Sequence, residues 1–348
     1  MAGTPLKIGI IGAGAIGQRR HIPEAKANPD CTLVAVCDAN AARVKEVAAK
    51  NDVKGYTDYK QMLEAEKLDA VVVCGPNTLH AQQTLDALKA GCHVLCEKPM
   101  ATTREEARAM IDAAAKAGKN LMIGHNQRLM PPHVCAKEIL ESGKLGKVIS
   151  FRTAFAHPGP EFWSVDNHAG TWFFKKGIAS LGVTGDLGVH KADLMRWLLG
   201  DEFSEVSAVI TTLNKRYPDG TLIDIDDNAV LTLRTRGGVL GTLMVSWTNY
   251  GAEDNWTVLY CEKGVLSIGT DPVWNVVVSY RNGDVEQHKV GEISTNTKQV
   301  SSGVLDQFVA EIQAGKKPAI DGEEGYRALD VILTAMEAAA ANKTMKIA

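Results

Sequence analysis

Three side chains in two short segments have the types and spacing that alcohol oxidation needs. The segment GDLGVHKAD places Asp186 and His190 four residues apart, and HVLCEKPM places Lys98 directly after an apolar run. Residues i and i+4 share one face of a helix, so the carboxylate and the imidazole would be neighbours. An imidazole titrates near neutral pH and suits proton transfer, and an ammonium can stabilise an alkoxide as it forms. The three residues could therefore take the proton of a secondary alcohol while hydride leaves its carbon.

The roles within this trio can be assigned in two ways. We expect His190 to be the acid/base and Lys98 to polarise the same oxygen, while Asp186 orients the imidazole or binds a hydroxyl. In the reversed assignment, Lys98 is the base. A structural alternative is that Asp186 complements a helix dipole and His190 packs in the core. A metal site of Asp186, His190 and His168 lacks a recognised spacing for the third ligand, so we expect no metal.

The first third of the chain predicts the framework that would hold Lys98. Apolar runs separated by helix-forming segments occur at 6–11, 32–37, 69–74, 93–97 and 120–125. Continuous apolar strands between helices predict a parallel sheet covered on both faces. Ligands bind at the carboxyl edge of such a sheet, where Lys98, Asn126 and Gln127 would lie.

A glycine-rich loop, GAGAIG, follows the first apolar run and opens a helix. Gly12 permits the tight turn, Gly14 lets the backbone approach a pyrophosphate, and Gly17 allows close packing of helix on strand. Asp38 ends the second run, where it could accept both ribose hydroxyls of NAD and repel the 2′-phosphate of NADP. Arg43 could soften that repulsion, and Asp38 could alternatively cap the next helix. We predict NAD as the cofactor, with NADP less favoured.

The loops at the carboxyl edge supply further cofactor-binding candidates. Asn77 in CGPNTLH could bond a ribose or equally cap a helix. Glu97 could position the turn that carries Lys98 and help to hold the cofactor. The predicted cofactor-binding residues are Gly12, Ala13, Gly14, Ala15, Ile16, Gly17, Asp38, Cys74, Gly75, Pro76, Asn77, His80, Glu97, Lys98 and Gln127.

Substrate-binding candidates come from the same edge and from an aromatic segment, HAGTWFFKK. Trp172 could pack on the nicotinamide or on a sugar face, and core or interface packing is the alternative. Asn126 and Gln127 are plausible hydroxyl-binding groups. Trp247 and Tyr250 are weaker candidates, with an interface role equally open. The predicted substrate-binding residues are Lys98, Asn126, Trp172, Asp186 and His190.

After about residue 126 the pattern changes to short strands joined by tight turns. Strand-like segments occur at 147–156, 204–213, 228–235, 239–248, 256–260, 265–268 and 274–281. They predict an antiparallel sheet. Further helices are predicted at about 132–142, 185–199, 302–314 and 322–341. We therefore predict an α/β protein with a dinucleotide-binding domain at 1–126 and a substrate-binding and oligomerisation domain at 127–348, whose C-terminal helix is a candidate to pack back on the first domain.

Length and composition narrow the class of protein. The 348 residues suffice for two domains, and contents of 45% hydrophobic and 23% charged residues are ordinary for a globular chain. A net charge of −3 gives no argument for binding nucleic acid or a membrane surface. The seven cysteines lack CxxC spacing, so we expect reduced thiols. The N-terminus lacks the features of a signal peptide, and no apolar run would span a bilayer, so we predict a cytoplasmic protein.

Three segments together resemble one enzyme family. GAGAIG, GPNTLHAQQTLDALKAGCHVLCEKPMATT and GDLGVHKADLMRWLLG are similar to the glucose–fructose oxidoreductase, inositol dehydrogenase and rhizopine catabolism (Gfo/Idh/MocA) family. The E-K-P turn and the D-x-x-x-H helix are the specific motifs. The resemblance implies an N-terminal Rossmann domain, a C-terminal α+β domain with a large, mostly antiparallel open sheet, and NAD(P)-dependent chemistry at a sugar or cyclic-polyol carbon. It places Lys98, Asp186 and His190 at the family's catalytic positions and implies a cis bond before Pro99.

The resemblance also implies a homodimer or homotetramer formed through the open sheet. Two departures lie near the expected substrate site: SLGVTGD keeps only Gly182 of three glycines common in the family, and GHNQRL lacks the larger or more basic residues that inositol dehydrogenases carry before Arg128. Inositol itself is therefore disfavoured. Two other functions stay open: a redox-neutral enzyme that recycles bound NAD while cleaving or rearranging a glycoside through a transient keto sugar, and a non-enzymatic NAD-binding regulator.

Overall fold

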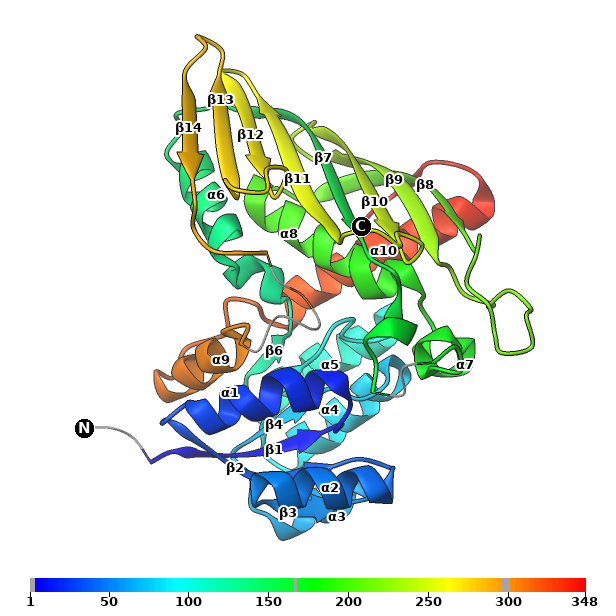
Figure 1. Cartoon of the computed structure of the whole chain (residues 1–348). Coiled ribbons are helices and arrows are strands. Elements are labelled where there is room, and N and C mark those ends of the chain that lie inside the picture. Colours follow the sequence, from blue (N-terminus) through cyan, green and yellow to red (C-terminus); the bar gives the residue numbers. More distant parts are fainter. Residues whose placement is uncertain (1–3, 166–167, 294, 296–300) are drawn as a thin grey trace.

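Two sheets organise the chain, and Figure 1 shows them as separate layers. The computed structural model describes residues 4–165, 168–293, 295 and 301–348. Six strands form the first sheet and nine form the second. Within the described residues, no helix has both the length and the apolar character needed to cross a membrane.

The first sheet is parallel throughout and has the strand order β3-β2-β1-β4-β5-β6. Its strands are β1 (Leu6–Ile11), β2 (Cys31–Cys37), β3 (Lys54–Tyr56), β4 (Ala70–Val73), β5 (His93–Cys96) and β6 (Leu121–Ile123). The helices between them are α1 (Ile22–Ala27), α2 (Ala41–Asn51), α3 (Tyr59–Ala65), α4 (His80–Lys89) and α5 (Arg104–Ala117). The strand order reverses between β1 and β4, and a crevice at such a switch point is where open sheets bind ligands. The predicted parallel sheet is confirmed.

Local signals set the ends of α5, which follows the turn carrying Lys98. The Thr103 side chain accepts a hydrogen bond from the Glu106 backbone, and Glu106 reciprocates in a capping box. Gly118 ends the helix in the left-handed conformation with φ 62°, which glycine adopts without strain.

The second sheet has the order β14-β13-β12-β11-β7-β10-β9-β8-β15. Its strands are β7 (Val148–Ala156), β8 (Phe203–Thr211), β9 (Asn228–Thr235), β10 (Leu240–Ser246), β11 (Asp254–Cys261), β12 (Gly264–Ile268), β13 (Val276–Tyr280), β14 (Val285–His288) and β15 (Met345–Lys346). Its pairs are antiparallel except for β7 with β10. The predicted antiparallel sheet is confirmed with that exception.

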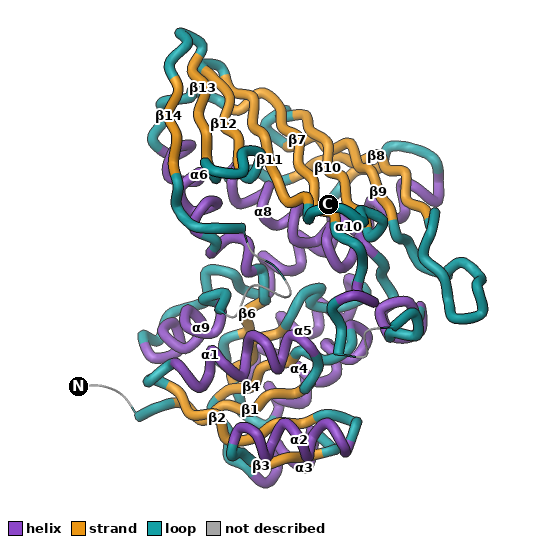
Figure 2. Tube along the Cα trace, in the orientation of Figure 1, coloured by secondary structure: helices purple, strands orange, loops and turns teal. Residues whose placement is uncertain are grey.

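One face of this sheet is packed and the other is open. Figure 2 shows α6 (Pro131–Glu141), α8 (Val189–Leu199) and α10 (Gly322–Ala341) on one face. Buried and exposed side chains alternate along β9 and β10, as expected when one face meets a core. On the opposite face, Val209 pairs with Val230, and Val230 pairs with Met244, and all three are exposed. This row is an apolar stripe across three strands.

The end of the chain returns to the first sheet. Helix α9 (Val304–Gln313) lies beside α1 in Figure 1, and its Leu305 and Phe308 share a buried cluster with Ile8 and Leu95. The segment just before α10 pairs with β6, because the Ile123 N–H donates to the Ile320 backbone oxygen. Helix α9 and the segment before α10 therefore complete the core of the first sheet.

We expect Phe308→Ala to destabilise the whole protein, because it opens a cavity where the C-terminal segment closes the first sheet. Phe308 is fully buried, and such truncations cost about 3–5 kcal/mol. The free energy of unfolding, measured in urea, checks this. Leu213→Ala, at a side chain that is 62% exposed, is the control. Equal losses in the two variants would contradict the packing role of α9.

Candidate active site

The glycine loop has the space and the contacts that a dinucleotide requires. Gly12 has φ 108°, and a Cβ there would lie 2.6 Å from the backbone of Cys74. A Cβ at Gly17 would lie 2.3 Å from the Gly12 oxygen, whereas a Cβ at Gly14 would meet nothing within 4 Å. Gly12 and Gly17 therefore serve the close packing of the loop, and Gly14 faces the open groove where a pyrophosphate would approach.

Asp38 lies at the same groove and ties the loop to the end of β2. Its Oδ2 accepts a hydrogen bond from the Ala13 N–H at 2.9 Å, and its Oδ1 accepts one from the Asn40 N–H at 2.9 Å. Arg43 Nη1 lies 3.2 Å from Oδ1. The alternative that Asp38 caps the next helix is wrong, because Asn40 is the N-cap of α2. Ala15, Ile16 and Pro76 line the groove with Asp38.

Side chains of the loop after β4 form hydrogen bonds with backbone oxygens of other segments of the chain. Asn77 Nδ2 donates to the Ala179 oxygen at 2.9 Å, at the end of α7 (Lys176–Ala179). The two ring nitrogens of His80 lie 2.8 Å from the Pro99 oxygen and 2.9 Å from the Gly75 oxygen. Both residues also line a pocket that contains Lys98, Asp186 and His190. Asn77 fastens the loop to the second layer, and His80 joins it to the turn after β5.

Lys98 and Asp186 meet between the two layers. Lys98 Nζ donates to Asp186 Oδ1 at 2.8 Å and to the Asp186 backbone oxygen at 2.9 Å. Trp247 Nε1 donates to Oδ2 at 3.1 Å. Burial would raise the pKa of Asp186, but the Lys98 charge, His157 and these hydrogen bonds outweigh it and hold the pKa below its usual range. Asp186 is therefore a carboxylate whose two oxygens are engaged by Lys98 and Trp247.

His190 lies one turn further along the same helical segment, on α8. Its ring is buried, and its Nδ1 has no hydrogen-bond partner among the described residues. The ring centroid lies 6.3 Å from that of His125 and 6.1 Å from that of Phe155. Burial, aided by the Lys98 charge, lowers the pKa of His190 well below its usual value. At neutral pH the imidazole is therefore uncharged and able to accept a proton.

Glu97 holds the turn that presents Lys98. Its Oε1 lies 2.9 Å from His21 Nε2 and 3.7 Å from Arg20 Nη1, and its Oε2 accepts the Lys98 N–H at 3.2 Å. Burial would raise the pKa of Glu97, but His21, Arg20 and Lys98 lower it to about 2. The expected cis bond between Lys98 and Pro99 is confirmed.

One pocket collects most of the predicted site residues. Its lining includes Ile16, Cys74, Gly75, Asn77, His80, Glu97, Lys98, Asn126, Gln127, Trp172, Asp186 and His190. It adjoins the glycine-loop groove, and Trp163, Trp172 and Phe173 line both. Trp172 and Phe173 are stacked with centroids 3.8 Å apart, and Trp163 meets Phe173 edge-on. An aromatic wall therefore runs from the groove into the pocket.

Other lining residues escaped the sequence analysis, namely Arg20, Pro99, Phe155, Trp163, Phe173, Leu187 and Thr295. Arg20 could have been found, since it lies three residues after Gly17 in the helical segment that the glycine loop opens. Tyr250, a weaker candidate, is exposed and bonds Asn214 instead. His168 is exposed and accepts the Gly170 N–H. Across the described ranges, no three His, Cys, Asp or Glu side chains group to hold a metal.

Buried polar atoms around the pocket have no hydrogen-bond partner in the described part of the chain. They are Arg20 Nε, both amide atoms of Gln127, Trp163 Nε1 and His190 Nδ1. Buried polar groups are normally bonded, and leaving one unpaired costs about 1–3 kcal/mol. A ligand with several hydroxyl groups would supply both donors and acceptors to such a pocket.

Comparison with known proteins decides the family. A model described as "Oxidoreductase family, NAD-binding Rossmann fold" matches residues 6–125, and a GFO/IDH/MocA C-terminal domain model matches residues 133–267. Levoglucosan dehydrogenase of Pseudarthrobacter phenanthrenivorans is 31% identical over 274 residues, covering 71% of this chain and 68% of that protein. The chain belongs to the Gfo/Idh/MocA oxidoreductase family.

Other members of the Gfo/Idh/MocA family extend the match to nearly the whole chain. D-glucoside 3-dehydrogenase of Escherichia coli is 28% identical over 339 residues, covering 94% of this chain and 93% of that protein. A solved structure of levoglucosan dehydrogenase with NADH superposes with a TM-score of 0.88 at 23% identity, covering 99% of this chain and 100% of that one, which shows the shared fold. The expected family, fold class and NAD cofactor are confirmed, within a family that includes sugar and polyol dehydrogenases.

A fully buried lysine directly follows His190. Lys191 is fully buried on α8, its Nζ lies 3.5 Å from the Trp256 oxygen, and it stands 6.0 Å from the centre of the Phe155 ring. Burial lowers the pKa of Lys191 from 10.5 to about 7, although the Glu253 carboxylate opposes the shift. The folded protein therefore binds this proton more weakly than the unfolded chain does.

We expect Lys191→Met to stabilise the protein, and by more at pH 7 than at about pH 10. Between the unfolded pKa of 10.5 and the folded value of about 7, folding must release the Lys191 proton, so stability falls as pH falls through this window. Thermal melts across the window measure the difference. Lys263→Met, at an exposed side chain, is the control. A gain that does not vary with pH would contradict the lowered pKa.

Proposed function

We propose that the protein is an NAD-dependent oxidoreductase that transfers hydride between the nicotinamide and a secondary hydroxyl of a sugar, sugar derivative or cyclic polyol. The observation that carries this proposal is the Lys98–Asp186 contact of 2.8 Å in a pocket that also contains His190 and adjoins the glycine-loop groove. NAD, when bound along that groove, supplies the hydride acceptor for oxidation. Lys98, Asp186 and His190 supply the groups that act on the hydroxyl.

His190 is the proton acceptor in this proposal, and Lys98 stabilises the alkoxide. The lowered pKa of His190 keeps its ring neutral, as a base must be. An ammonium has three donors, and Lys98 uses two of them on Asp186, which leaves one for the substrate oxygen. Asp186 holds the ammonium in place and, through Trp247, ties it to the second sheet.

The pocket lining supports a sugar-like substrate. Asn126 and Gln127 present amide groups to the pocket, and Trp172 and Phe173 offer ring faces to the C–H patches of a sugar. Relatives are named for levoglucosan, a D-glucoside and myo-inositol. The reduced glycine content before Asp186 and the GHNQRL segment favour a sugar derivative over inositol.

One observation favours the redox-neutral alternative. Trp163, Trp172 and Phe173 line both the groove and the pocket, so the wall that meets a substrate would also cover part of the cofactor. A covered cofactor suits an enzyme that oxidises and re-reduces its substrate in one cycle. Stoichiometry separates the two reactions: a dehydrogenase forms one NADH per substrate oxidised, whereas a glycoside-cleaving enzyme releases aglycone without net NADH. If the biological activity of the protein were unchanged after Lys98→Ala, the third alternative, a non-enzymatic NAD-binding regulator, would be favoured instead.

We expect His190→Ala to lower kcat for polyol oxidation by about 10²–10⁴-fold and to remove the acidic limb of the pH–rate profile. That limb lies below pH 6.5 in the unaltered protein, since the pKa of His190 is lowered from 6.5 and its ring must be neutral to act. NADH absorbance measures the rates, with sugars, anhydrosugars and inositols as substrates. His288→Ala on β14 is the control. Near-full turnover of His190→Ala would make Lys98 the base, and failure of every polyol would refute the function.

We also propose that the open face of the second sheet joins copies of this chain as a dimer or tetramer. The apolar stripe of Val209, Val230 and Met244 would be buried in such an interface, as large exposed apolar surfaces usually are. Light scattering should give twice or four times the chain mass, and Val230→Glu should shift it to the monomer. Leu213→Glu, in the loop after β8, should leave it unchanged. A monomeric unaltered protein would refute the interface.

A further inference from the structure

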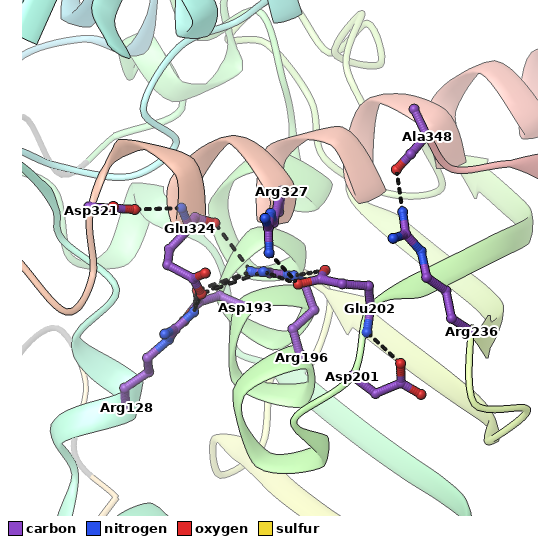
Figure 3. Close-up of polar contacts among 10 residues, drawn as sticks. All are labelled: Arg128, Asp193, Arg196, Asp201, Glu202, Arg236, Asp321, Glu324, Arg327 and Ala348. Atoms are coloured by element: carbon purple, nitrogen blue, oxygen red, sulfur yellow. Dashed lines mark hydrogen bonds and ion pairs between the residues drawn. The ribbon is translucent and has the colours of Figure 1, made fainter. Parts of the chain in front are cut away.

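A buried charged network lies behind the pocket and joins the two layers. Arg128 directly follows Asn126 and Gln127 in the 3-10 turn after β6, and its guanidinium is buried. Its Nε and Nη2 donate to the two Asp193 oxygens at 2.7 and 2.5 Å, and Nη2 also lies 2.6 Å from Glu324 Oε2. Figure 3 shows the Arg128 side chain pointing to both carboxylates. The pairing with Asp193 uses two nitrogens on one edge of a planar guanidinium, so it fixes orientation as well as distance.

The rest of this network belongs to the helices of the second layer. Arg196 on α8 donates to the two Glu202 oxygens at 2.6 and 2.8 Å and to the Glu324 backbone oxygen at 3.2 Å. Arg327 on α10 bonds Glu202 at 2.9 Å, as Figure 3 also shows. Helices α8 and α10 are therefore held to one another, and Arg128 brings the end of β6 into the same network.

Both partners of the Arg128–Asp193 pair lie close in sequence to residues of the pocket. Asp193 is fully buried on α8, three residues after His190, so the two lie on neighbouring turns. On the other side, His125 precedes the turn, and its ring meets that of His190 edge-on at 6.3 Å. A shift of the turn against α8 would therefore move His190 relative to Lys98, Asn126 and Gln127.

We propose that Arg128 is a positioning residue: through Asp193 and Glu324 it fixes α8 against the end of β6 and so holds His190 at the hydroxyl bound between the two layers. This inference rests on the proposed function. Displacing a catalytic group by about 1 Å can cost about 10²-fold in rate, so a pair that sets this distance controls turnover without touching the substrate.

The test compares Arg128→Lys with Arg104→Lys in the full chain. Lysine keeps the charge but loses the two-pronged pairing. Arg104 supplies a matched control, because it links α5 to α10 through Asp330, Thr334 and Glu337 and is not part of the pocket lining. We expect Arg128→Lys to lower kcat by about 10–100-fold with KM for NAD+ within about twofold of the unaltered protein, whereas Arg104→Lys lowers Tm and leaves kcat within about twofold.

Two further measurements separate positioning from general stability. Arg128→Lys combined with Asp193→Asn should lose little more rate than either single change, because both break one pair. Isotope-labelled histidine NMR, with the His190 signal assigned by its absence from His190→Ala, reports the ring without turnover. Arg128→Lys should shift or broaden that signal, and Arg104→Lys should leave it unchanged.

The outcomes distinguish this inference from the proposed function. If the unaltered protein forms no NADH from any polyol, the proposed function fails and the His190 signal alone decides the positioning role. If the unaltered protein is active and Arg128→Lys keeps its kcat, or if Arg104→Lys loses as much kcat, the positioning role is refuted. An unmoved His190 signal in Arg128→Lys refutes it in either case.

Discussion

The contact between Lys98 and Asp186 requires that the two layers be held together, and the rest of the structure provides this. An ammonium at the end of a buried strand and a carboxylate at the start of a buried helix are each costly to bury alone, and pairing them offsets much of that cost. Lys98 belongs to the first layer and Asp186 to the second, so the pair forms only when the two layers are docked. In the proposed reaction, the same contact would hold the Lys98 amine beside the substrate oxygen.

Docking is therefore secured at several places around the pocket. Asn77 bonds the Ala179 backbone, and Arg128 bonds Asp193. Helix α9 packs in the core of the first sheet, and α10 begins against β6. The chain crosses between the layers more than once, so moving one layer without the other would break these contacts. A rigid junction suits hydride and proton transfer, because both depend on fixed distances between groups from the two layers.

Features that depend on the spacing of neighbouring residues could be predicted from the sequence. The parallel strands, the glycine loop and the D-x-x-x-H helix depend on residues close together in the chain, and all lie where they were expected. Short elements escaped: β3, β14 and β15 have few residues and no continuous apolar run. The partners of site residues also escaped, because Trp247 lies 61 residues from Asp186 and Ala179 lies 102 from Asn77. Such pairings are set by the packing of the layers, which a single sequence does not display.

The electrostatics of the pocket follow from the burial of its side chains. Burial penalises charge, so His190 stays neutral and is ready to accept a proton, while Glu97 stays ionised only because His21, Arg20 and Lys98 surround it. In the proposed reaction, the Lys98 ammonium would favour a negative charge on a substrate oxygen, and low polarity would strengthen that attraction. In the proposed reaction, the burial of these side chains would therefore have two effects: it would keep His190 uncharged, and it would strengthen the attraction between Lys98 and the substrate oxygen. The polar atoms of Gln127 and Trp163 that lack a partner among the described residues are the cost of this arrangement, and a hydroxyl-rich ligand would offset it.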